Sequence, residues 1–236
     1  MKYLLYKSGL VALCLLASQI RGESAAFVAS SQSQGAPSPV CQSPDATSKP
    51  REVPVREKAV VIEYSELVEA MTTPSPALSE KIRLAYGYSG LGILAVRGIP
   101  DLASLRSTLL PLANRYANLP DSVKNETTRP HAYFQVGWSH GNEKLQGDAP
   151  DWGKGSYYAN PLIDVPSDDP ELIKRFPSFL EPNVWPDEGM PELEKAFKGC
   201  GKKVVEVGRL VARLCDDFVS TQVEGYEGRM EQVLTE

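Results

Sequence analysis

The chain has 236 residues, of which 42% are hydrophobic and 23% are charged, so it can bury a sizeable core and does not belong to the disordered class. Its formal net charge is -5, and its 25 lysines and arginines are scattered without a basic face. This distribution excludes the electrostatic surface typical of nucleic-acid binding, so we expect no nucleic-acid partner.

Residues 1–26 have the pattern of a secretory signal peptide. Lys2 and Lys7 provide a positive start, an apolar run follows from Gly9 to Ile20, and small residues lead to a cleavage position near Ala26. The run is too short to span a bilayer, and no later stretch is a membrane candidate. We therefore expect entry into the secretory pathway and no integral membrane segment.

Residues 27–57 are rich in Ser, Pro and Gln, which predicts a disordered linker or a transit-like segment. The Ala26-Phe27 step resembles the cleavage-site phenylalanine of two-part plastid leaders, in which a signal peptide precedes a transit segment. The destination is therefore either outside the cell or a plastid.

The ordered part is expected to begin near Lys58. The β-branched run over 59–64 predicts a strand, and 65–71 predicts a short helix that ends before Pro74. Ser79 is the predicted cap of a helix over 80–86, whose inward residues would be Ile82, Leu84 and Ala85.

A second strand is predicted over 92–97. Asp101 is the predicted cap of a helix of about 18 residues, with apolar residues at helical spacing from Leu102 to Tyr116. This helix should end at Leu119-Pro120. Its apolar positions are expected to be core.

A long helix is predicted from about Pro191 to Val219. Its apolar residues recur every three or four positions from Leu193 to Phe218, forming a seam about 40 Å long at the helical rise. Gly199, Gly201 and Gly208 weaken a helix, so we expect them to mark close approaches of another backbone. A seam of this length needs a large partner surface.

Four cysteines give no disulfide framework. Cys14 lies in the predicted signal peptide, and Cys200 and Cys215 fall on the long helix, ~22 Å apart at the helical rise. That separation is far beyond the reach of a disulfide.

Between these helices, residues 129–186 alternate aromatics, glycines and Asn-Pro turns, which is typical of an ordered, irregular segment held against a body. His131 and His140 lie within it, with Glu143 and Asp148 nearby. This constellation is loose, and loop histidines more commonly form hydrogen bonds than bind metals.

Six pieces of the sequence occur in a characteristic order: Val60–Ser65, Gly92–Ile99, Leu119-Pro120, Gly155–Pro161, Asn183–Asp187 and the long helix. Together, over about residues 58–220, they resemble the N-terminal domain of the isopenicillin N synthase-like, non-haem Fe(II) and 2-oxoglutarate-dependent oxygenases. The resemblance implies an α+β fold, mainly helical, with a few short strands and one long C-terminal helix. The catalytic double-stranded β-helix is absent from this chain, and residues 221–236 form a tail.

In that family two histidines and a carboxylate, spaced His-x-Asp or His-x-Glu with a distant second His, hold Fe(II) in the β-helix that follows the long helix. An Arg-x-Ser there binds 2-oxoglutarate. Neither His131 nor His140 has a carboxylate two residues later, and both precede the long helix. We therefore assign no catalytic, cofactor-binding or metal-binding residue. Fe(II) and 2-oxoglutarate are implied only for the full-length family.

In isopenicillin N synthase an Arg and a Tyr four residues apart, with a residue of the Ser-aromatic-x-x-Asn-Pro segment, face the substrate. By motif these positions fall on Arg129, Tyr133 and Tyr158. An Arg can clamp a carboxylate, and a Tyr offers an apolar wall with a polar tip. The alternative is that Tyr157, Tyr158 and Trp185 are loop packing and that Arg129 forms a surface ion pair.

The resemblance implies the substrate-side domain of an oxygenase, truncated and inactive on its own. Its partner would be the missing catalytic domain, or another chain, covering the seam from Leu193 to Phe218. A small molecule would be the substrate of the full-length enzyme. The alternative is a non-enzymatic interaction module that keeps the fold and buries the long helix against a partner chain or a second copy.

Overall fold

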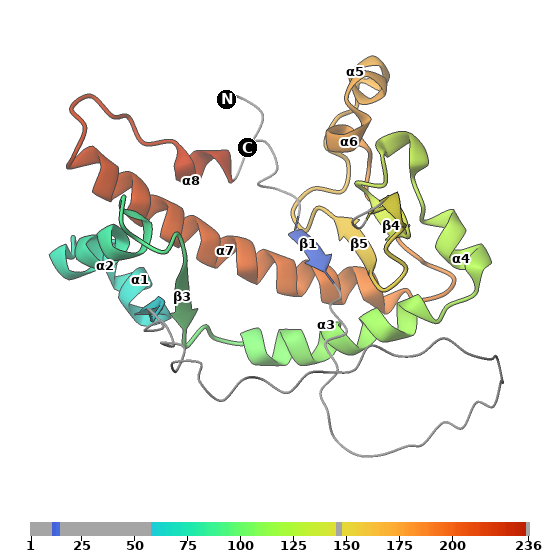
Figure 1. Cartoon of the computed structure of the whole chain (residues 1–236), viewed down its shortest axis with the longest axis horizontal. Helices are drawn as coiled ribbons and strands as arrows, with labels where there is room; N and C mark the ends of the chain where they lie inside the picture. Colours follow the sequence, from blue (N-terminus) through green and yellow to red (C-terminus); the bar gives the residue numbers. More distant parts are fainter. Residues whose placement is uncertain (1–10, 15–57, 145–147, 235–236) are drawn as a thin grey trace, which may run out of the picture. The chain divides into compact units, whose positions relative to one another are not determined.

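The computed structural model of the chain (Figure 1) describes residues 11–14, 58–144 and 148–234. The predicted linker over 27–57 lies outside these residues. Of the predicted signal peptide over 1–26, only the backbone of Val11–Cys14 is described.

The described residues from Ala59 onward belong, with Val11–Cys14, to one compact unit. It is an α+β unit, as the sequence predicts. Its elements, in chain order, are β1 (Val11–Cys14), β2 (Val60–Glu63), α1 (Tyr64–Ala70), α2 (Pro76–Tyr86), β3 (Leu94–Arg97), α3 (Leu102–Ala117), α4 (Asp121–Glu126), the 3-10 helix η1 (Pro130–Ala132), β4 (Gly137–His140), β5 (Gly155–Ala159), α5 (Pro170–Arg175), α6 (Pro177–Leu180), α7 (Glu192–Ser220) and α8 (Met230–Val233).

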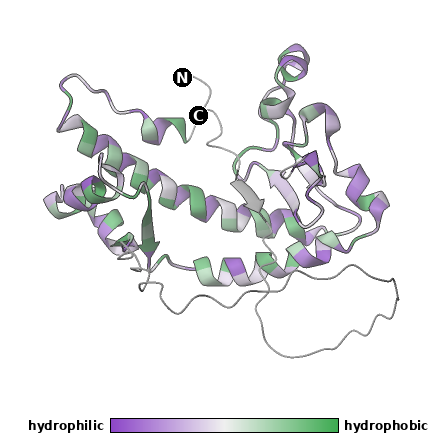
Figure 2. Ribbon diagram, in the orientation of Figure 1, coloured by the Kyte–Doolittle hydropathy of each residue, from purple (hydrophilic) through white to green (hydrophobic). Residues whose placement is uncertain are grey.

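The described strands form two small sheets, and neither closes into a barrel. One has the order β1-β5-β4 with antiparallel pairs, and the other is the parallel pair β2-β3. In the parallel pair Val60 lies opposite Leu94 and Ile62 opposite Val96. Figure 2 shows most of β3 as hydrophobic, and Leu94 and Val96 of this strand pack against a hydrophobic core. No helix in the described part of the chain combines the length and apolar character needed to cross a membrane.

The prediction for α2 was wrong at its start. The helix begins at Pro76, and Ser75 rather than Ser79 is the cap, because the Ser75 hydroxyl accepts a hydrogen bond from the Leu78 amide at 3.3 Å. A proline fits the first helical position, where the amide would have no helical partner. Ile82 and Ala85 are buried as predicted, but Leu84 is 51% exposed.

The Leu-rich helix α3 has Asp101 at its cap position, but the Asp101 side chain forms no capping hydrogen bond. The backbone of Asp101 is in the left-handed region, with a φ of 60°, and this residue marks the turn from β3 into the helix. Leu109, Leu112 and Tyr116 are buried, as the spacing predicts. The short helix α4 that follows was not predicted, because none of its residues is buried and it has no apolar period.

The long helix α7 starts and ends within one residue of its predicted bounds. It runs beside α3 (Figure 1) and joins two hydrophobic cores. The aromatic core contains Leu109, Leu112, Tyr116, Trp138, Tyr157, Ala159, Met190, Leu193, Phe197 and Cys200. The aliphatic core contains Ile62, Leu67, Leu78, Ile82, Val207 and Leu214.

These two cores correct the expectation that the seam needs an outside partner. Leu193, Phe197 and Cys200 are buried in the aromatic core, and Val207 and Leu214 in the aliphatic core. Only Val204, between the two cores, is exposed, at 46%, among the seam residues, which are Leu193, Phe197, Cys200, Val204, Val207, Val211, Leu214 and Phe218. The chain therefore covers most of this seam with its own elements.

The three glycines of α7 differ in their surroundings. A Cβ added to Gly201 would lie 2.5 Å from Cβ of Pro161 and within 3.9 Å of its Cα, so a close backbone approach is confirmed there. Gly199 and Gly208 meet only side chains, those of Leu105 and Leu234, at 3.4 and 4.0 Å.

Both helix cysteines are free: Cys200 is buried and Cys215 is half-buried. Burial raises the pKa of Cys200, and burial with the nearby Asp216 raises the pKa of Cys215 to about 11. The thiolate is the nucleophile, so Cys215 should be a slow target near neutral pH.

We expect iodoacetamide to alkylate Cys215 of the native chain at pH 8 on the order of 100-fold more slowly than in urea, because few of the folded thiols ionise at that pH. In the folded chain the rate should keep rising until the pH reaches about 11. In the unfolded chain it should level off near pH 9, close to the ordinary thiol pKa of about 8.5. Peptide mass spectrometry measures both rates, and a native plateau near pH 9 would contradict the burial of this thiol.

The predicted tail folds back onto α7 through α8. Asp216 of α7 accepts hydrogen bonds from the Tyr226 hydroxyl at 2.6 Å and from the amides of Arg229, Met230 and Glu231 at 3.0–3.2 Å. Burial alone would raise the pKa of Asp216, but these donors outweigh it and the pKa is lowered. The carboxylate is thus the cap of α8.

Asp216→Ala is expected to release α8, at a cost of about 1–3 kcal/mol, because it leaves three amides without an acceptor. Hydrogen exchange of the amides over 229–234 should become at least about fivefold faster, since 1.4 kcal/mol corresponds to a factor of ten and the lower end of the range to about five. The exposed neighbour Asp217 provides the control Asp217→Ala, which should leave exchange unchanged. The folded-state pKa of Asp216 is depressed. Its contribution to the free energy of unfolding is therefore fully present above the ordinary carboxyl pKa of about 4, and it is lost as the pH falls through the folded-state pKa.

Candidate functional site

The irregular segment over 129–186 is organised around the rings of the aromatic core. The Tyr157 ring of β5 lies 5.0 Å from Tyr116, 6.0 Å from Trp185 and 6.3 Å from Phe197, measured between centroids. The Trp138 ring of β4 lies 5.2 Å from Tyr116. These mixed edge and stacked contacts fix both strands against α3 and α7.

The two core tyrosines also use their hydroxyls. Tyr157 donates to the Val184 carbonyl, and the hydroxyls of Tyr116 and Thr127 are hydrogen-bonded to each other. Burial raises the pKa of Tyr116 to about 12 and raises that of Tyr157 further. Both stay protonated at neutral pH and act as fixed structural groups.

The turn at Asn160-Pro161 and the piece from Asn183 to Pro186 are held together by side-chain amides. Asn183 accepts from the Asn160 amide and donates to the Asn160 carbonyl, both at 2.8 Å. Asp164 accepts from the Trp185 indole at 3.2 Å and forms an ion pair with Lys198 of α7. Burial opposes ionisation of Asp164, but the Lys198, Asn183 and Trp185 donors outweigh it and lower its pKa. This network pins the segment to α7.

The first predicted substrate residue, Arg129, has partners within the chain. Its Nε lies 3.3 Å from Oε1 of Glu181, and its Nη1 donates to the carbonyls of Glu126 at 2.7 Å and Thr128 at 3.2 Å. His131 Nε2 lies 3.0 Å from Oε2 of the same Glu181, which is 14% exposed. Glu181 therefore joins the end of α6 to the η1 turn. The substrate role of Arg129 stays a prediction.

The second predicted residue, Tyr133, lies in a strained turn directly after η1. Tyr133 and Phe134 both have left-handed backbones, with φ of 54° and 57°. Their amides donate to the carbonyls of Pro130 and Arg129 at 2.9 and 3.1 Å, which holds the turn in place. Tyr133 is 70% exposed. Two successive non-glycine residues in this conformation are uncommon, and such strain clusters at functional sites.

The third predicted residue, Tyr158, lies on β5 opposite Gly137 of β4. Gly137 also bridges to Thr128, the residue before Arg129, so the backbone places all three predicted positions in one region. The Tyr158 side chain is half-buried, and its hydroxyl donates to Oε1 of Glu143 at 3.4 Å. Its substrate role also stays a prediction.

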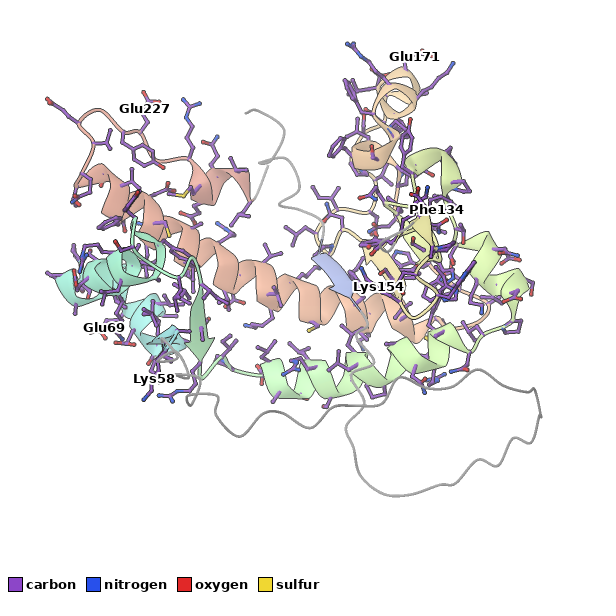
Figure 3. All side chains as sticks on the ribbon, in the orientation of Figure 1. Lys58, Glu69, Phe134, Lys154, Glu171 and Glu227 are labelled. Atoms are coloured by element: carbon purple, nitrogen blue, oxygen red, sulfur yellow. The ribbon has the colours of Figure 1, made fainter. Side chains whose placement is uncertain are left out.

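A cavity of about 280 Å³ opens beside this region, between α4, the strained turn and β4. Phe134, one of its wall residues, is labelled in Figure 3. Its walls are Asp121, Lys124, Asn125, Thr128, Phe134, Trp138, His140 and Asn142. Sequence reasoning missed it because four of its eight wall residues come from the unpredicted helix α4 and from Thr128 just after it. The only available signal was the pair of polar residues at helical spacing, Asp121 and Lys124.

His140 stands at one side of this cavity. Its Nε2 lies 3.0 Å from the Trp152 carbonyl, and its ring lies 5.3 Å from Trp152 and 5.8 Å from Trp138. The next residue, Gly141, is covered by Trp152, because an added Cβ would lie 2.3 Å from that ring. His140 is therefore positioned by aromatic packing.

A family model described as non-haem dioxygenase in morphine synthesis N-terminal matches residues 61–188. This match covers more than half of the chain, from β2 through the irregular segment. The chain belongs to the non-haem dioxygenase N-terminal domain family. The resemblance seen in the sequence is thereby confirmed. No curated protein and no solved structure matches the chain.

For a non-haem dioxygenase domain the implied metal is iron, and the described residues do not fit it. Over 58–144 and 148–234, no group of three or more His, Cys, Asp and Glu side chains is arranged to hold a metal ion. The chain has two histidines. His131 is bound to Glu181, and His140 contacts a backbone carbonyl. A facial triad of two histidines and one carboxylate would need both of them in one place.

Proposed function

We propose that this chain supplies the substrate-side N-terminal domain of an Fe(II)- and 2-oxoglutarate-dependent oxygenase and has no turnover on its own. The observation that carries the proposal is the family match over 61–188 in a chain whose histidines, His131 and His140, lack the ligand spacing. When bound in the complete site, Fe(II) with 2-oxoglutarate and dioxygen supplies the oxidation of a small organic molecule.

The contribution of this chain would be a preorganised wall for the substrate. Arg129 has five N–H donors, and the contacts described above engage three of them, on Nε and Nη1. The two on Nη2 have no partner among the described residues, so they are available to a substrate carboxylate. Tyr133, 70% exposed beside it, would provide an apolar wall. Tyr158 would complete it from β5.

Iron binding by the purified chain tests the first part. Equilibrium dialysis against Fe(II) without oxygen, followed by metal analysis, should find no stoichiometric iron, and 2-oxoglutarate should not be converted to succinate. Stoichiometric iron that disappears in His131→Ala and His140→Ala would overturn the proposal. Binding unaffected by either substitution would place iron on other residues and would also overturn it.

Sequencing the transcript beyond the codon for Glu236 tests the second part. We expect an open frame that carries His-x-Asp, a distant His and Arg-x-Ser. A transcript that lacks these motifs would favour the interaction module.

For localisation we propose that residues 1–26 direct the chain into the secretory pathway, on the basis of the charged start and short apolar run. A C-terminal fluorescent fusion should be secreted or reach a plastid, and removal of residues 1–26 should abolish either result. Phe27→Ala distinguishes the two destinations, because it should redirect a plastid protein and leave a secreted one unchanged. A full-length fusion that stays in the cytosol contradicts the proposal.

A further inference from the structure

We propose that the cavity between α4 and β4 binds a small neutral ring that carries several hydroxyl groups, such as a monosaccharide or a cyclitol. The proposal goes beyond the oxygenase function and does not rest on it. It is carried by the charge, the hydrogen-bonding groups, the apolar walls and the size of the cavity.

The cavity has no unbalanced cation for an anionic ligand. Lys124 is its single lysine or arginine, and its Nζ lies 3.0 Å from Oδ1 of Asp121, another wall residue. The same Nζ donates to the Ala117 carbonyl at 3.2 Å. With two of its three protons engaged, Lys124 offers one donor and little net field. A phosphate or dicarboxylate would lack a counterion here.

Several wall groups have unused hydrogen-bond donors. The Asn125 side chain forms no hydrogen bond to any described residue, so both of its amide protons are available in addition to the one left on Lys124. The indole N–H of Trp138 also has no described partner, although Trp138 is only 8% exposed. Every fully buried side-chain nitrogen or oxygen in the described part of the chain has a hydrogen-bond partner. Because this N–H has none, it is not fully buried and reaches solvent.

The orientation of Trp138 agrees with this conclusion. An added Cβ on Gly155 would lie 2.2 Å from Cη2 of the indole and 3.0 Å from Cζ2 and Cζ3. The outer edge of the six-membered ring therefore packs on Gly155, and the N–H lies on the five-membered ring at the other end.

The wall has matching acceptors. The Trp152 carbonyl can only accept, so His140 Nε2 carries the proton, and in the neutral ring Nδ1 is a free acceptor. The Asn142 amide nitrogen donates to Ser139 and to the His140 carbonyl, both at 3.3 Å, so its oxygen is free. Thr128 donates to the Lys124 carbonyl at 2.8 Å and keeps its lone pairs.

Mixed donors and acceptors around one space suit hydroxyl groups, because each hydroxyl both donates and accepts. An ammonium group would use only the acceptors, and a carboxylate only the donors. Phe134 and Trp138 are the two aromatic residues in mostly polar walls, and they offer a small apolar surface to the carbon side of a ring. The volume of about 280 Å³ lies just below the usual range of ligand pockets, about 300–1,000 Å³, so the cavity has room for a single ring and no more.

Saturation-transfer NMR tests this site on the full 236-residue chain, made without N-glycosylation because residues 125–127 (Asn-Glu-Thr) form a glycosylation sequon. The probes are methyl α-glucopyranoside and myo-inositol, and the charged comparators are succinate and glycine. At least one neutral probe should bind, with a Kd of about 1–10 mM, typical of a small contact surface. Asn125→Ala should weaken that binding at least about fivefold, through loss of one side-chain hydrogen-bonding group. The exposed neighbour Glu126, outside the cavity wall, provides the control Glu126→Ala, which should leave the Kd unchanged.

A second variant, Trp138→Phe, keeps a ring in the core and removes only the N–H and part of the indole. It should also weaken binding, while circular dichroism should show a retained fold. The proposal is overturned if neither neutral probe binds, if Asn125→Ala and Glu126→Ala behave alike, or if succinate or glycine binds in preference to both neutral probes.

Discussion

Phe197→Ala is expected to lower the free energy of unfolding by about 3–5 kcal/mol, the range for removing a fully buried aromatic ring. Phe197 is 1% exposed, and its ring lies 5.7 Å from Trp185 and 6.3 Å from Tyr157. Removal of the Phe197 ring leaves a cavity where α7 and β5 meet the hydrogen-bond network of Asn160, Asp164 and Asn183. Because Trp185 is in contact with the substituted site, urea unfolding should be followed by far-ultraviolet circular dichroism.

The same helix provides the matched control. Val204 belongs to the same apolar seam but is 46% exposed, between the two cores. Val204→Ala should therefore cost less than about 1 kcal/mol, since nearly half of the side chain is already exposed to solvent. If Val204→Ala is as costly as Phe197→Ala, then something covers the middle of α7, and an external partner for the seam must be reconsidered.

Gly137→Ala should destabilise the chain by about 3 kcal/mol or more, which combines a left-handed backbone cost of about 1–2 kcal/mol with displaced hydrogen bonds. Gly137 has a φ of 72°, and an added Cβ would lie 1.7 Å from the Thr127 carbonyl oxygen. That oxygen accepts from the Trp138 amide at 3.0 Å, so it cannot move without breaking the start of β4. Chemical denaturation measures the loss.

Gly92→Ala separates the clash from the backbone conformation. Gly92 has nearly the same φ, 71°, but nothing lies within 4 Å of its added Cβ. This variant should lose only the left-handed cost of about 1–2 kcal/mol. Equal losses at Gly92 and Gly137 would show that the bridge between Thr128 and Gly137 does not constrain the native chain.

Local sequence was sufficient for elements whose apolar spacing is strong. The long helix α7 and the buried face of α3 follow directly from residues three and four apart, such as Leu109, Leu112 and Tyr116. The same rule failed for α4, which buries none of its residues. It also misplaced the cap of α2, since Ser75 and Ser79 are equally good caps until the structure shows which hydroxyl meets a free amide.

The sequence by itself determined the family. No single motif between Val60 and Asp187 is specific, but the order of the short motifs is, and the family match over 61–188 confirms the assignment. It also determined that α7 has one apolar seam. Only the tertiary structure decided what covers that seam, since hydrophobic burial is non-directional and a stripe does not specify its partner. The two cores of the chain cover it, on either side of Val204.

The cavity likewise depends on tertiary structure. Its wall joins Asn125 of α4 to Trp138 and His140 of β4, across the strained turn at Phe134. Each of these residues alone reads as an ordinary surface or core position. Their unused donors and acceptors become a site only where the pairing of β4 with β5 and the packing of Trp138 on Gly155 bring them around one space.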